Sequence, residues 1–466
     1  MTSESQTATS EENALRAQLA ELMRTATAAR SGDDAYWAIA NGKSAQPSAP
    51  AAPAAAPTAV ADPTTNWETE TEPRTVHRRF RDDELAAAAA QPTAPFVPAE
   101  PTSLRAAGLT ESEVEALILK CLLNCGDVAG RAIAEQLHLP FRIVQQLLAQ
   151  LKLERLVVYR GDAGLNDYQY QLTDAGADRA KRFAQHCTYF GAAPVALEDY
   201  IQSVHAQTLT VKKPSRSDLE RAFTDLVLST DMFSQLGQAL HAGKGLFLYG
   251  SPGNGKTAIA QRVTAAYGEM IWIPRCISVH GEIVRLFDPT CHQEAPPPSP
   301  PGIFQNVPVD QRWVRIRRPT IVVGGELTME SLEIKTNRQT GIGEAPLQMK
   351  SNCGTLVIDD FGRQRISTDE LLNRWIVPLE TGYDFLSVAS GRKVQVPFDQ
   401  LIVFSTNLEP ADLVDEAFLR RIPYKLEVLD PSEAQFRAIF MSLSAKMKLA
   451  CSGEVIDYLI EKHYKG

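Results

Sequence analysis

Three short, largely apolar runs in the second half of the chain are each followed at once by polar or turn-forming residues. The runs are Leu246–Tyr249, Thr355–Ile358 and Leu401–Phe404. Continuous apolar runs of this length are typical of strands buried on both faces, as in a parallel sheet covered by helices. This pattern predicts an α/β core with a parallel sheet.

Residues 109–186 have a different pattern, in which apolar positions first recur at helical spacing and then alternate. The elements predicted here are a helix after the capping pair Thr110 and Glu113, helices over Gly130–Leu137 and Phe141–Leu153, a hairpin around Gly161–Gly164, and a helix capped by Thr173. Three helices followed by a two-stranded wing resemble the winged-helix fold.

The third of these helices bears on what such a module would bind. It would present one arginine and three glutamines, with two further cations at its end: Arg142, Gln145, Gln146, Gln150, Lys152 and Arg155. A surface that follows DNA phosphates normally carries a denser stripe of Lys and Arg. The sequence therefore favours protein docking over binding of duplex DNA, and leaves both open.

The first 105 residues follow neither pattern. Residues Ser44–Thr65 consist almost entirely of Ala, Pro, Ser and Thr, which cannot bury a core, and one short helix is expected around Glu12–Ala29. We expect a largely disordered N-terminal arm.

The predicted organisation is an arm over residues 1–105, a winged-helix domain over 106–187, a linker over 188–216, a nucleotide-binding core over 217–430 and a partial helical lid over 431–466.

The composition indicates the cellular environment and the classes of partner that suit the protein. The chain has 466 residues, a net charge of −9 and seven cysteines, none of which forms a CxxC pair. The charge argues against a global attraction to nucleic acid or anionic lipid, and the cysteines fit a reducing compartment. No run approaches the roughly 20 apolar residues of a membrane span, and the acidic N-terminus lacks the pattern of a signal peptide. We therefore expect a cytoplasmic protein without membrane insertion.

The strongest chemical signal is the glycine-rich segment between the first apolar run and a predicted helix. It reads Gly250-Ser251-Pro252-Gly253-Asn254-Gly255-Lys256-Thr257. In this context the glycines allow backbone N–H groups to surround phosphates, and the N-terminus of the following helix adds partial positive charge. Lys256 would contact the β- and γ-phosphates, and the hydroxyl of Thr257 would bind Mg²⁺. The sequence thus predicts binding of a nucleoside triphosphate with Mg²⁺.

Polar side chains at the ends of the other two apolar runs complete the candidate site. Asp359 is placed to hold Mg²⁺ through water, and Asp360 is placed to act as the general base that polarises the attacking water. Asn407, just after the third run, has an amide that can orient the same water. Arg420 and Arg421 end a predicted helix and lie too far along the chain to belong to the phosphate loop.

As a set, these motifs resemble those of AAA+ ATPases, over residues 218–466. The matching positions are Gly250–Thr257 for Walker A, Asp359 and Asp360 for Walker B, Asn407 for sensor 1, and Arg421, with Arg420 beside it, for the arginine finger. The resemblance implies that the nucleotide is ATP and that the reaction is ATP hydrolysis. Because such fingers act on the ATP of a neighbouring subunit, it also implies a ring, most often a hexamer.

Two stretches are similar to the pre-sensor-1 hairpin branch of that family, which includes MoxR-type chaperones and bacterial enhancer-binding activators. One is a hairpin over Phe385–Pro397, and the other is Ala345–Thr355, which runs into Walker B. The activators' GAFTGA loop is absent, and the nearest stretch, Thr336–Gly343, is the candidate for a loop that contacts substrate near a pore. The stretch from Gly324–Leu327 through Asp359–Gln364 to Phe418–Arg421 also resembles bacterial AAA+ ATPases described as having chaperone activity and an association with pilus assembly.

Two departures from the family pattern bear on activity. The usual Walker B pair is Asp–Glu, but this chain has Asp–Asp. The shorter side chain withdraws the base by about one methylene, and a misplacement near 1 Å can cost on the order of 10²-fold in rate. The predicted lid also ends before the helix that normally carries the sensor-2 arginine, and the position of Arg437 fits that role poorly. From the Asp–Asp pair we expect hydrolysis to be slow or conditional on ring closure. From the short lid we expect either that sensor 2 is dispensed with or that the chain is truncated.

Three functions are compatible with these features. The first is an ATP-driven, chaperone-like ring that remodels protein complexes, with an unknown protein client. The second is a DNA-linked ATPase, a helper in replication, transposition or transcription, whose winged helix binds duplex DNA. The third is a slow switch that assembles on ATP. The acidic net charge and the sparse cations of the third winged-helix segment favour the first over the second.

Overall fold

The computed structural model describes residues 96–164, 166–210, 213–268, 270–296, 308–449 and 451–464. Nearly all of the predicted arm over residues 1–105 lies outside these ranges, including the helix expected around Glu12–Ala29. The contacts of the chain divide it into two compact units, residues 1–85 with 444–466, and residues 86–443.

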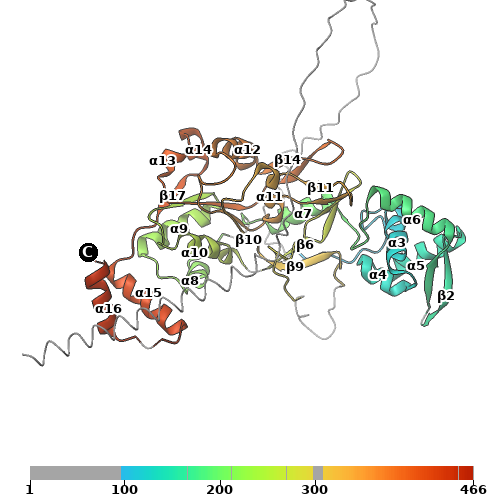
Figure 1. Ribbon diagram of the computed structural model, residues 1–466, viewed down its shortest axis with the longest axis horizontal. Helices are drawn as coiled ribbons and strands as arrows, with labels where there is room; N and C mark the ends of the chain where they lie inside the picture. The colour runs from blue at the N-terminus through green and yellow to red at the C-terminus, as the bar shows by residue number, and fades with distance from the viewer. Residues whose placement is uncertain are drawn as a thin grey trace, which may run out of the picture. The chain divides into compact units, whose positions relative to one another are not determined.

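A five-stranded parallel sheet forms the centre of the unit that spans residues 86–443. Its order is β10-β13-β16-β5-β17, and every neighbouring pair is parallel. The strands are β10 (Thr320–Val323), β13 (Thr355–Ile358), β16 (Leu401–Thr406), β5 (Leu246–Tyr249) and β17 (Tyr424–Glu427). The three apolar runs of the sequence are therefore the three inner strands, which confirms the predicted α/β class. The two edge strands of this sheet, β10 and β17, are labelled in Figure 1.

Alternate residues of the inner strands enter two separate cores. In β16, Leu401 and Val403 pack on one face of the sheet, and Ile402 and Phe404 pack on the other. The covering helices are α9 (Thr230–Ala242) and α10 (Lys256–Val263) on the first face, and α12 (Thr368–Thr381) and α14 (Glu416–Arg421) on the second. Burial on both faces explains why these strands are continuous apolar runs.

A second five-stranded sheet has the order β11-β12-β8-β7-β4. Its strands are β11 (Lys335–Asn337), β12 (Ile342–Glu344), β8 (Glu282–Arg285), β7 (Cys276–Val279) and β4 (Val195–Ala196). A separate antiparallel pair consists of β6 (Met270–Pro274) and β9 (Trp313–Arg317). The sequence analysis does not predict these strands, and three of them, β4, β11 and β12, have only two or three residues, too few to establish a period.

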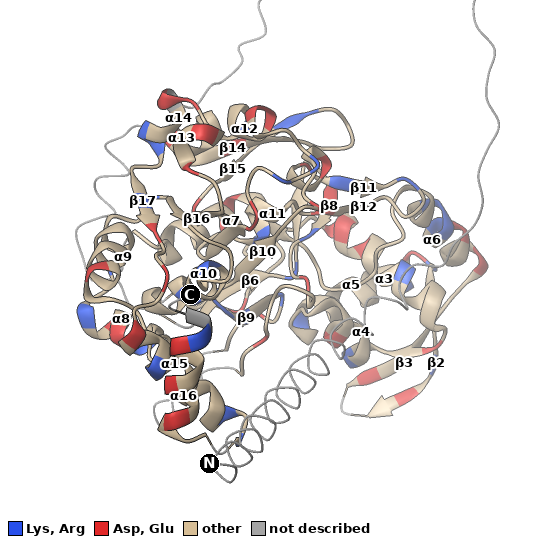
Figure 2. Cartoon of the chain, turned by 60° about the vertical axis from the view of Figure 1, so that its left-hand side comes forward, with Lys and Arg blue, Asp and Glu red and all other residues tan. Residues whose placement is uncertain are grey.

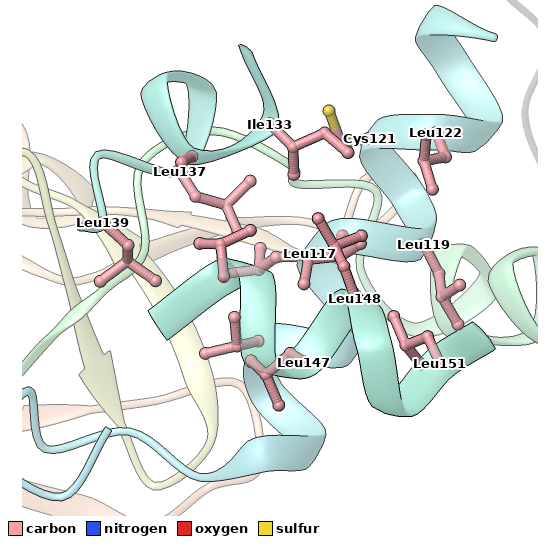
Figure 3. Close-up of a cluster of buried hydrophobic side chains, with 14 of the residues drawn as sticks. Leu117, Leu119, Cys121, Leu122, Ile133, Leu137, Leu139, Leu147, Leu148 and Leu151 are labelled. Carbon is pink, nitrogen blue, oxygen red and sulfur yellow. The ribbon is translucent and has the colours of Figure 1, made fainter. Parts of the chain in front are cut away.

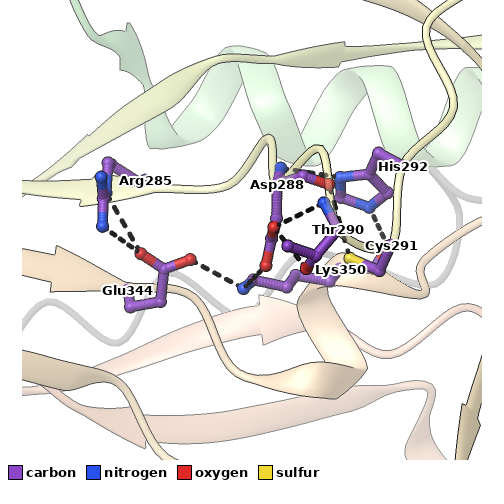
Figure 4. A network of polar contacts seen from close by, with 7 residues as sticks. All are labelled: Arg285, Asp288, Thr290, Cys291, His292, Glu344 and Lys350. Atoms are coloured by element: carbon purple, nitrogen blue, oxygen red, sulfur yellow. Dashed lines mark hydrogen bonds and ion pairs between the residues drawn. The ribbon is translucent and has the colours of Figure 1, made fainter. Parts of the chain in front are cut away.

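A partly buried ion network ties the second sheet to the segment before β13. Lys350, at the end of α11 (Leu347–Lys350), donates through Nζ to Asp288 and to Glu344, both at 2.7 Å (Figure 4). Burial alone would lower the pKa of Lys350, but the two carboxylates hold it above its usual value. His292 joins the network, since its Nδ1 accepts from the Asp288 backbone N–H at 3.0 Å. The network therefore fixes the end of β12 against α11.

The segment predicted to contain three helices and a wing has these elements and one short extra strand, β1. Its elements are α3 (Glu111–Cys125), β1 (Val128–Ala129), α4 (Gly130–Leu137), α5 (Phe141–Leu153), β2 (Val157–Gly164), β3 (Asp167–Leu172) and α6 (Asp174–His186). The strands form an antiparallel sheet in the order β1-β3-β2. Thr110 and Glu113 form the predicted capping box, and Thr173 caps α6 as predicted. We refer to this segment, α3 to α6, as the α3–α6 module.

Leucines at helical spacing fill the core of the α3–α6 module. Leu117 of α3, Leu137 of α4 and Leu148 of α5 are buried together (Figure 3). Outside this apolar core, the carboxylate of the buried Asp167 accepts from the backbone N–H groups of Gly130 and Arg131, at 3.0 and 2.9 Å. A residue of the wing thus caps α4, a pairing that local sequence rules do not reveal.

Residues 188–216 are not the linker that the sequence predicts. They contain β4 and α7 (Leu197–Gln207), and Tyr200 of α7 is buried in a core shared with the second sheet. Pro194 and Pro214 flank α7 and do not interrupt it. The next two helices are α8 (Arg216–Ala222) and α9, and they are separate because Ser229 begins α9 with its own cap.

The described part of the predicted lid is helical. It consists of α15 (Glu433–Lys446), α16 (Gly453–Leu459) and a π-helical turn, Ile460–Tyr464. Among the described helices of the whole chain, none combines the length and apolar character that a membrane span requires.

Candidate nucleotide-binding site

The predicted phosphate loop connects β5 to α10. Gly250, Gly253 and Gly255 have φ values of +132°, +90° and +83°, a region that other residues adopt only with strain. Gly250 is also required by space, since a Cβ there would lie 2.5 Å from the carbonyl oxygen of Val428. Ser251 and Pro252 are exposed at the turn of the loop. The backbone therefore has the conformation that a phosphate-binding loop needs.

The side chain of Lys256 folds back into this loop. Only 7% of the residue is exposed, and its Nζ donates to the carbonyl oxygens of Gly250 at 2.9 Å and Ser251 at 2.8 Å. Burial lowers the pKa of Lys256, although Asp359 and Asp360 act in the opposite direction. The ammonium group is thus held where phosphate oxygens can replace the two carbonyls as its partners.

Thr257 and Asp359 meet although they lie far apart in the sequence. The Thr257 hydroxyl donates to Oδ2 of Asp359 at 2.8 Å. Thr257 belongs to the first turn of α10, and Asp359 directly follows β13, where its own N–H donates to Val323 of β10 at 2.8 Å. A hydroxyl and a carboxylate at this spacing are suitable oxygen ligands for Mg²⁺ beside a phosphate loop.

Asp360 and Asn407 lie at the same edge of the sheet. Asp360 follows Asp359, is exposed, and has a φ of +49°. Asn407 follows β16, whose last residue, Thr406, pairs with Tyr249 at the end of β5. Because all these strands are parallel, their carboxyl ends place Asp360, Asn407 and the phosphate loop along one edge.

Asn254 has a structural role that sequence reasoning misses. Its Nδ2 donates to the carbonyl oxygen of Val428 at 2.9 Å and to Oδ1 of Asp430 at 2.8 Å. These contacts fasten the phosphate loop to the chain that leaves β17. Such a pairing between distant segments has no local signal in the sequence.

The structure does not bring Arg420 or Arg421 to the phosphate loop. Ile422, the next residue, lies beside Gly245, where an added Cβ would be 3.8 Å from its side chain, and Gly245 precedes β5. The two arginines therefore lie near the amino edge of the sheet, opposite the loop. Arg421 forms an ion pair with Glu380 of α12 at 2.6 Å, and Arg420 forms a longer one with Glu416 at 3.5 Å.

The stretch proposed as a pore loop, Thr336–Gly343, is a hairpin whose tip packs against the α3–α6 module. The Thr188 backbone N–H donates to the Thr340 carbonyl oxygen at 2.8 Å. Gly341 approaches so closely that a Cβ there would lie 2.1 Å from the carbonyl oxygen of His186. Within one chain this tip is therefore engaged with residues 186–188, which the sequence does not indicate.

The predicted pre-sensor-1 hairpin is present as β14 (Tyr383–Ser387) and β15 (Lys393–Pro397). Its tip is also anchored, because the backbone N–H groups of Ala389 and Ser390 donate to the Glu282 carboxylate at 3.0 and 2.9 Å.

In the lid segment, Arg437 pairs with Glu433 one turn away on α15, at 3.0 Å.

No protein-family model matches the sequence, and a search of curated proteins finds no similar one. Among solved structures, a complex between subunits BchI and BchD of magnesium chelatase matches at 18% identity, with a TM-score of 0.34, over 52% of this chain and 71% of that one. NtrX from Brucella abortus in complex with ATP matches at 16% identity, with a TM-score of 0.29, over 50% of this chain. A second NtrX structure matches at 17% identity, with a TM-score of 0.30, also over 50% of this chain. This chain spans 45% and 43% of the two NtrX chains.

All three TM-scores lie below 0.5, so the site is defined by the geometry of this chain itself. That geometry has three parts: a parallel sheet, a glycine-rich loop between an inner strand and a helix, and a Thr257–Asp359 pair beside that loop. Together they form a parallel α/β core with a glycine-rich loop at the carboxyl edge of its sheet, which is the arrangement that the sequence motifs predict.

Proposed function

We propose that the chain binds MgATP in the loop Gly250–Thr257 and hydrolyses it. The observation that carries this proposal is the convergence of Lys256, Thr257 and Asp359: a buried ammonium group turned into the loop, beside a hydroxyl and a carboxylate 2.8 Å apart. Lys256 would exchange its two carbonyl partners for oxygens of the β- and γ-phosphates. Mg²⁺, held by Thr257 and through water by Asp359, would neutralise charge that develops on the phosphates.

Two further groups of the site would act on the attacking water. Asp360 would accept the proton of the attacking water, and the Asn407 amide would orient that water. Arg421, with Arg420 beside it, would reach the ATP of a neighbouring subunit, since both lie at the opposite edge of their own sheet. We therefore propose a cytoplasmic ring, most often a hexamer in this family, in which assembly completes each site.

We further propose that the ring remodels protein complexes and that the α3–α6 module is a winged helix that docks protein. Leu153, at the end of α5, is 84% exposed, and Tyr168 of the hairpin is 39% exposed. The Lys152 ammonium lies 3.5 Å from the ring centre of Tyr159, which stacks on Tyr168. This cation thus faces an aromatic ring, and acidic residues also lie on the hairpin (Figure 2). An exposed apolar and aromatic surface suits a protein partner better than DNA phosphates.

The test is steady-state ATP hydrolysis by the purified chain, with Lys256→Ala as the blank. It is run alone, with duplex DNA and with an unfolded polypeptide. We expect turnover above the blank, raised by polypeptide and not by DNA. Stimulation by DNA, lost steeply with salt, would replace the remodelling role with a DNA-linked one. Turnover no higher than the blank under every condition would favour an assembly switch.

A matched pair of glycine variants tests whether the α3–α6 module acts on the ATPase through the hairpin β11–β12. Gly341→Ala would force a Cβ to within 2.1 Å of the His186 carbonyl oxygen. Gly391→Ala, in the other hairpin, meets the same backbone strain, with a φ of +78° against +65°, but has no atom within 4 Å. We expect Gly341→Ala to lose stimulation by polypeptide and keep unstimulated turnover, whereas Gly391→Ala keeps both. Full stimulation of Gly341→Ala would contradict the coupling.

A further inference from the structure

A single side chain, Gln364, holds the backbone turn that follows β13. Its Nε2 donates to the carbonyl oxygens of Asp359 at 2.9 Å and Asp360 at 3.1 Å. Its Oε1 accepts from the backbone N–H of Gly362 at 2.8 Å. One amide thus contacts the backbone of three of the four residues from 359 to 362.

These three partners fix the orientation of the Gln364 amide. The NH₂ group has two hydrogens and meets two carbonyl oxygens, while the carbonyl oxygen meets one N–H. The reversed amide would direct a donor at the Gly362 N–H and an acceptor at two carbonyl oxygens, so the pattern admits one assignment. Glutamate has the same shape but lacks both donors, and asparagine is one methylene shorter. Glutamine is therefore the residue type that satisfies all three contacts.

The turn is otherwise anchored on both sides of Asp360. Before it, the Asp359 N–H donates to Val323 at 2.8 Å. After it, Phe361 is 1% exposed, its N–H donates to Ser405 at 2.8 Å, and its carbonyl oxygen accepts from the Thr406 hydroxyl at 3.1 Å. Asp360 lies between these anchors in the left-handed region, with a φ of +49°, which is unfavourable for aspartate and persists where surrounding contacts enforce it.

We infer that Gln364 is a positioning residue for hydrolysis, which holds the left-handed turn so that the Asp360 carboxylate faces the attacking water. This inference rests on the proposed function and adds a residue to it. The physical reason is the short base: aspartate reaches about one methylene less far than glutamate, so its backbone must be held closely, since a misplacement near 1 Å can cost on the order of 10²-fold in rate. Gln364 makes no contact with a nucleotide ligand in this role and acts through Asp360.

The test is Gln364→Glu, which keeps the size of the side chain and the acceptor for the Gly362 N–H but sets a carboxylate oxygen against two carbonyl oxygens. The control is Gln395→Glu, the same change at an exposed position of β15. We expect Gln364→Glu to lower kcat about tenfold or more, within the range that misplacement of a catalytic group produces. We expect the Kd for MgADP and the thermal unfolding midpoint to remain those of the Gln395→Glu control.

A double-mutant cycle with Asp360→Asn separates positioning from a general structural effect. If Gln364 acts through Asp360, Gln364→Glu adds no further loss of single-turnover rate in the Asp360→Asn background. Wild-type kcat in Gln364→Glu, or an equal loss in both backgrounds, would overturn the role of Gln364. Joint loss of kcat and MgADP binding would overturn it as well. A wild-type chain no faster than Lys256→Ala would instead overturn the proposed function, and the inference with it.

Discussion

The two edges of the parallel sheet differ in whether the proposed catalytic groups lie beside the phosphate loop of the same chain. At the carboxyl edge, Lys256 is already turned into the loop, and Thr257 is bonded to Asp359 at 2.8 Å. At the amino edge, Arg421 is paired with Glu380, away from the loop. The proposed nucleotide-binding groups therefore lie together in one chain, whereas Arg421, if it acts in hydrolysis as proposed, would act on the nucleotide of another chain.

This difference separates binding from turnover. A chain alone should bind MgATP, because every proposed binding group lies at one edge of its own sheet. It should hydrolyse ATP only when a neighbour supplies Arg421, since an arginine directed at the γ-phosphate stabilises charge in the transition state.

The largest effect on nucleotide binding is expected from Lys256→Ala at the carboxyl edge. Loss of a buried cation that meets phosphate oxygens costs about 3 kcal/mol or more, so affinity for MgADP should fall by at least ~100-fold. Isothermal titration measures it. Lys244→Ala, an exposed lysine at the amino edge, serves as the control and should bind as wild type. Equal binding by both variants would contradict the placement of the nucleotide.

At the amino edge, Arg421→Ala should bind MgATP normally and lose turnover on the order of 10³-fold, the scale of an arginine finger. Glu380→Gln is the matched control, because it removes the same ion pair and keeps the guanidinium group. That pair is partly exposed and is worth at most about 1 kcal/mol, so Glu380→Gln should keep turnover within a few-fold of wild type. Equal losses in the two variants would show that the ion pair matters and the finger does not.

A smaller effect, on the order of 10²-fold or more in kcat, is expected from Asp360→Asn, which removes the general base. Because Asp360 is exposed and makes no part of the Thr257–Asp359 pair, MgATP binding should persist. Equilibrium binding and single-turnover hydrolysis on one preparation measure both quantities. Full turnover in Asp360→Asn would exclude this residue as the base.

The sequence predicted those parts of the molecule whose signals are local. The three apolar runs became the inner strands, and Thr110 with Glu113 capped α3, because each depends on residues a few positions apart. The contacts of Asn254 with Asp430 and of Arg421 with Glu380 could not be predicted, since they join distant segments. The prediction of a linker over residues 188–216 was wrong for a related reason: α7 is buried against a sheet whose strands come from distant segments of the chain.

Mixing two inactive variants tests the central claim most directly. Arg421→Ala keeps a complete carboxyl edge but lacks the finger, and Asp360→Asn keeps the finger but lacks the base. If Arg421 acts on a neighbour's ATP, a mixed ring contains interfaces where an Asp360→Asn subunit supplies Arg421 to the intact site of an Arg421→Ala subunit. We predict that the mixture hydrolyses ATP well above the sum of its separate components. A mixture that assembles and yet hydrolyses no faster than that sum would contradict the account.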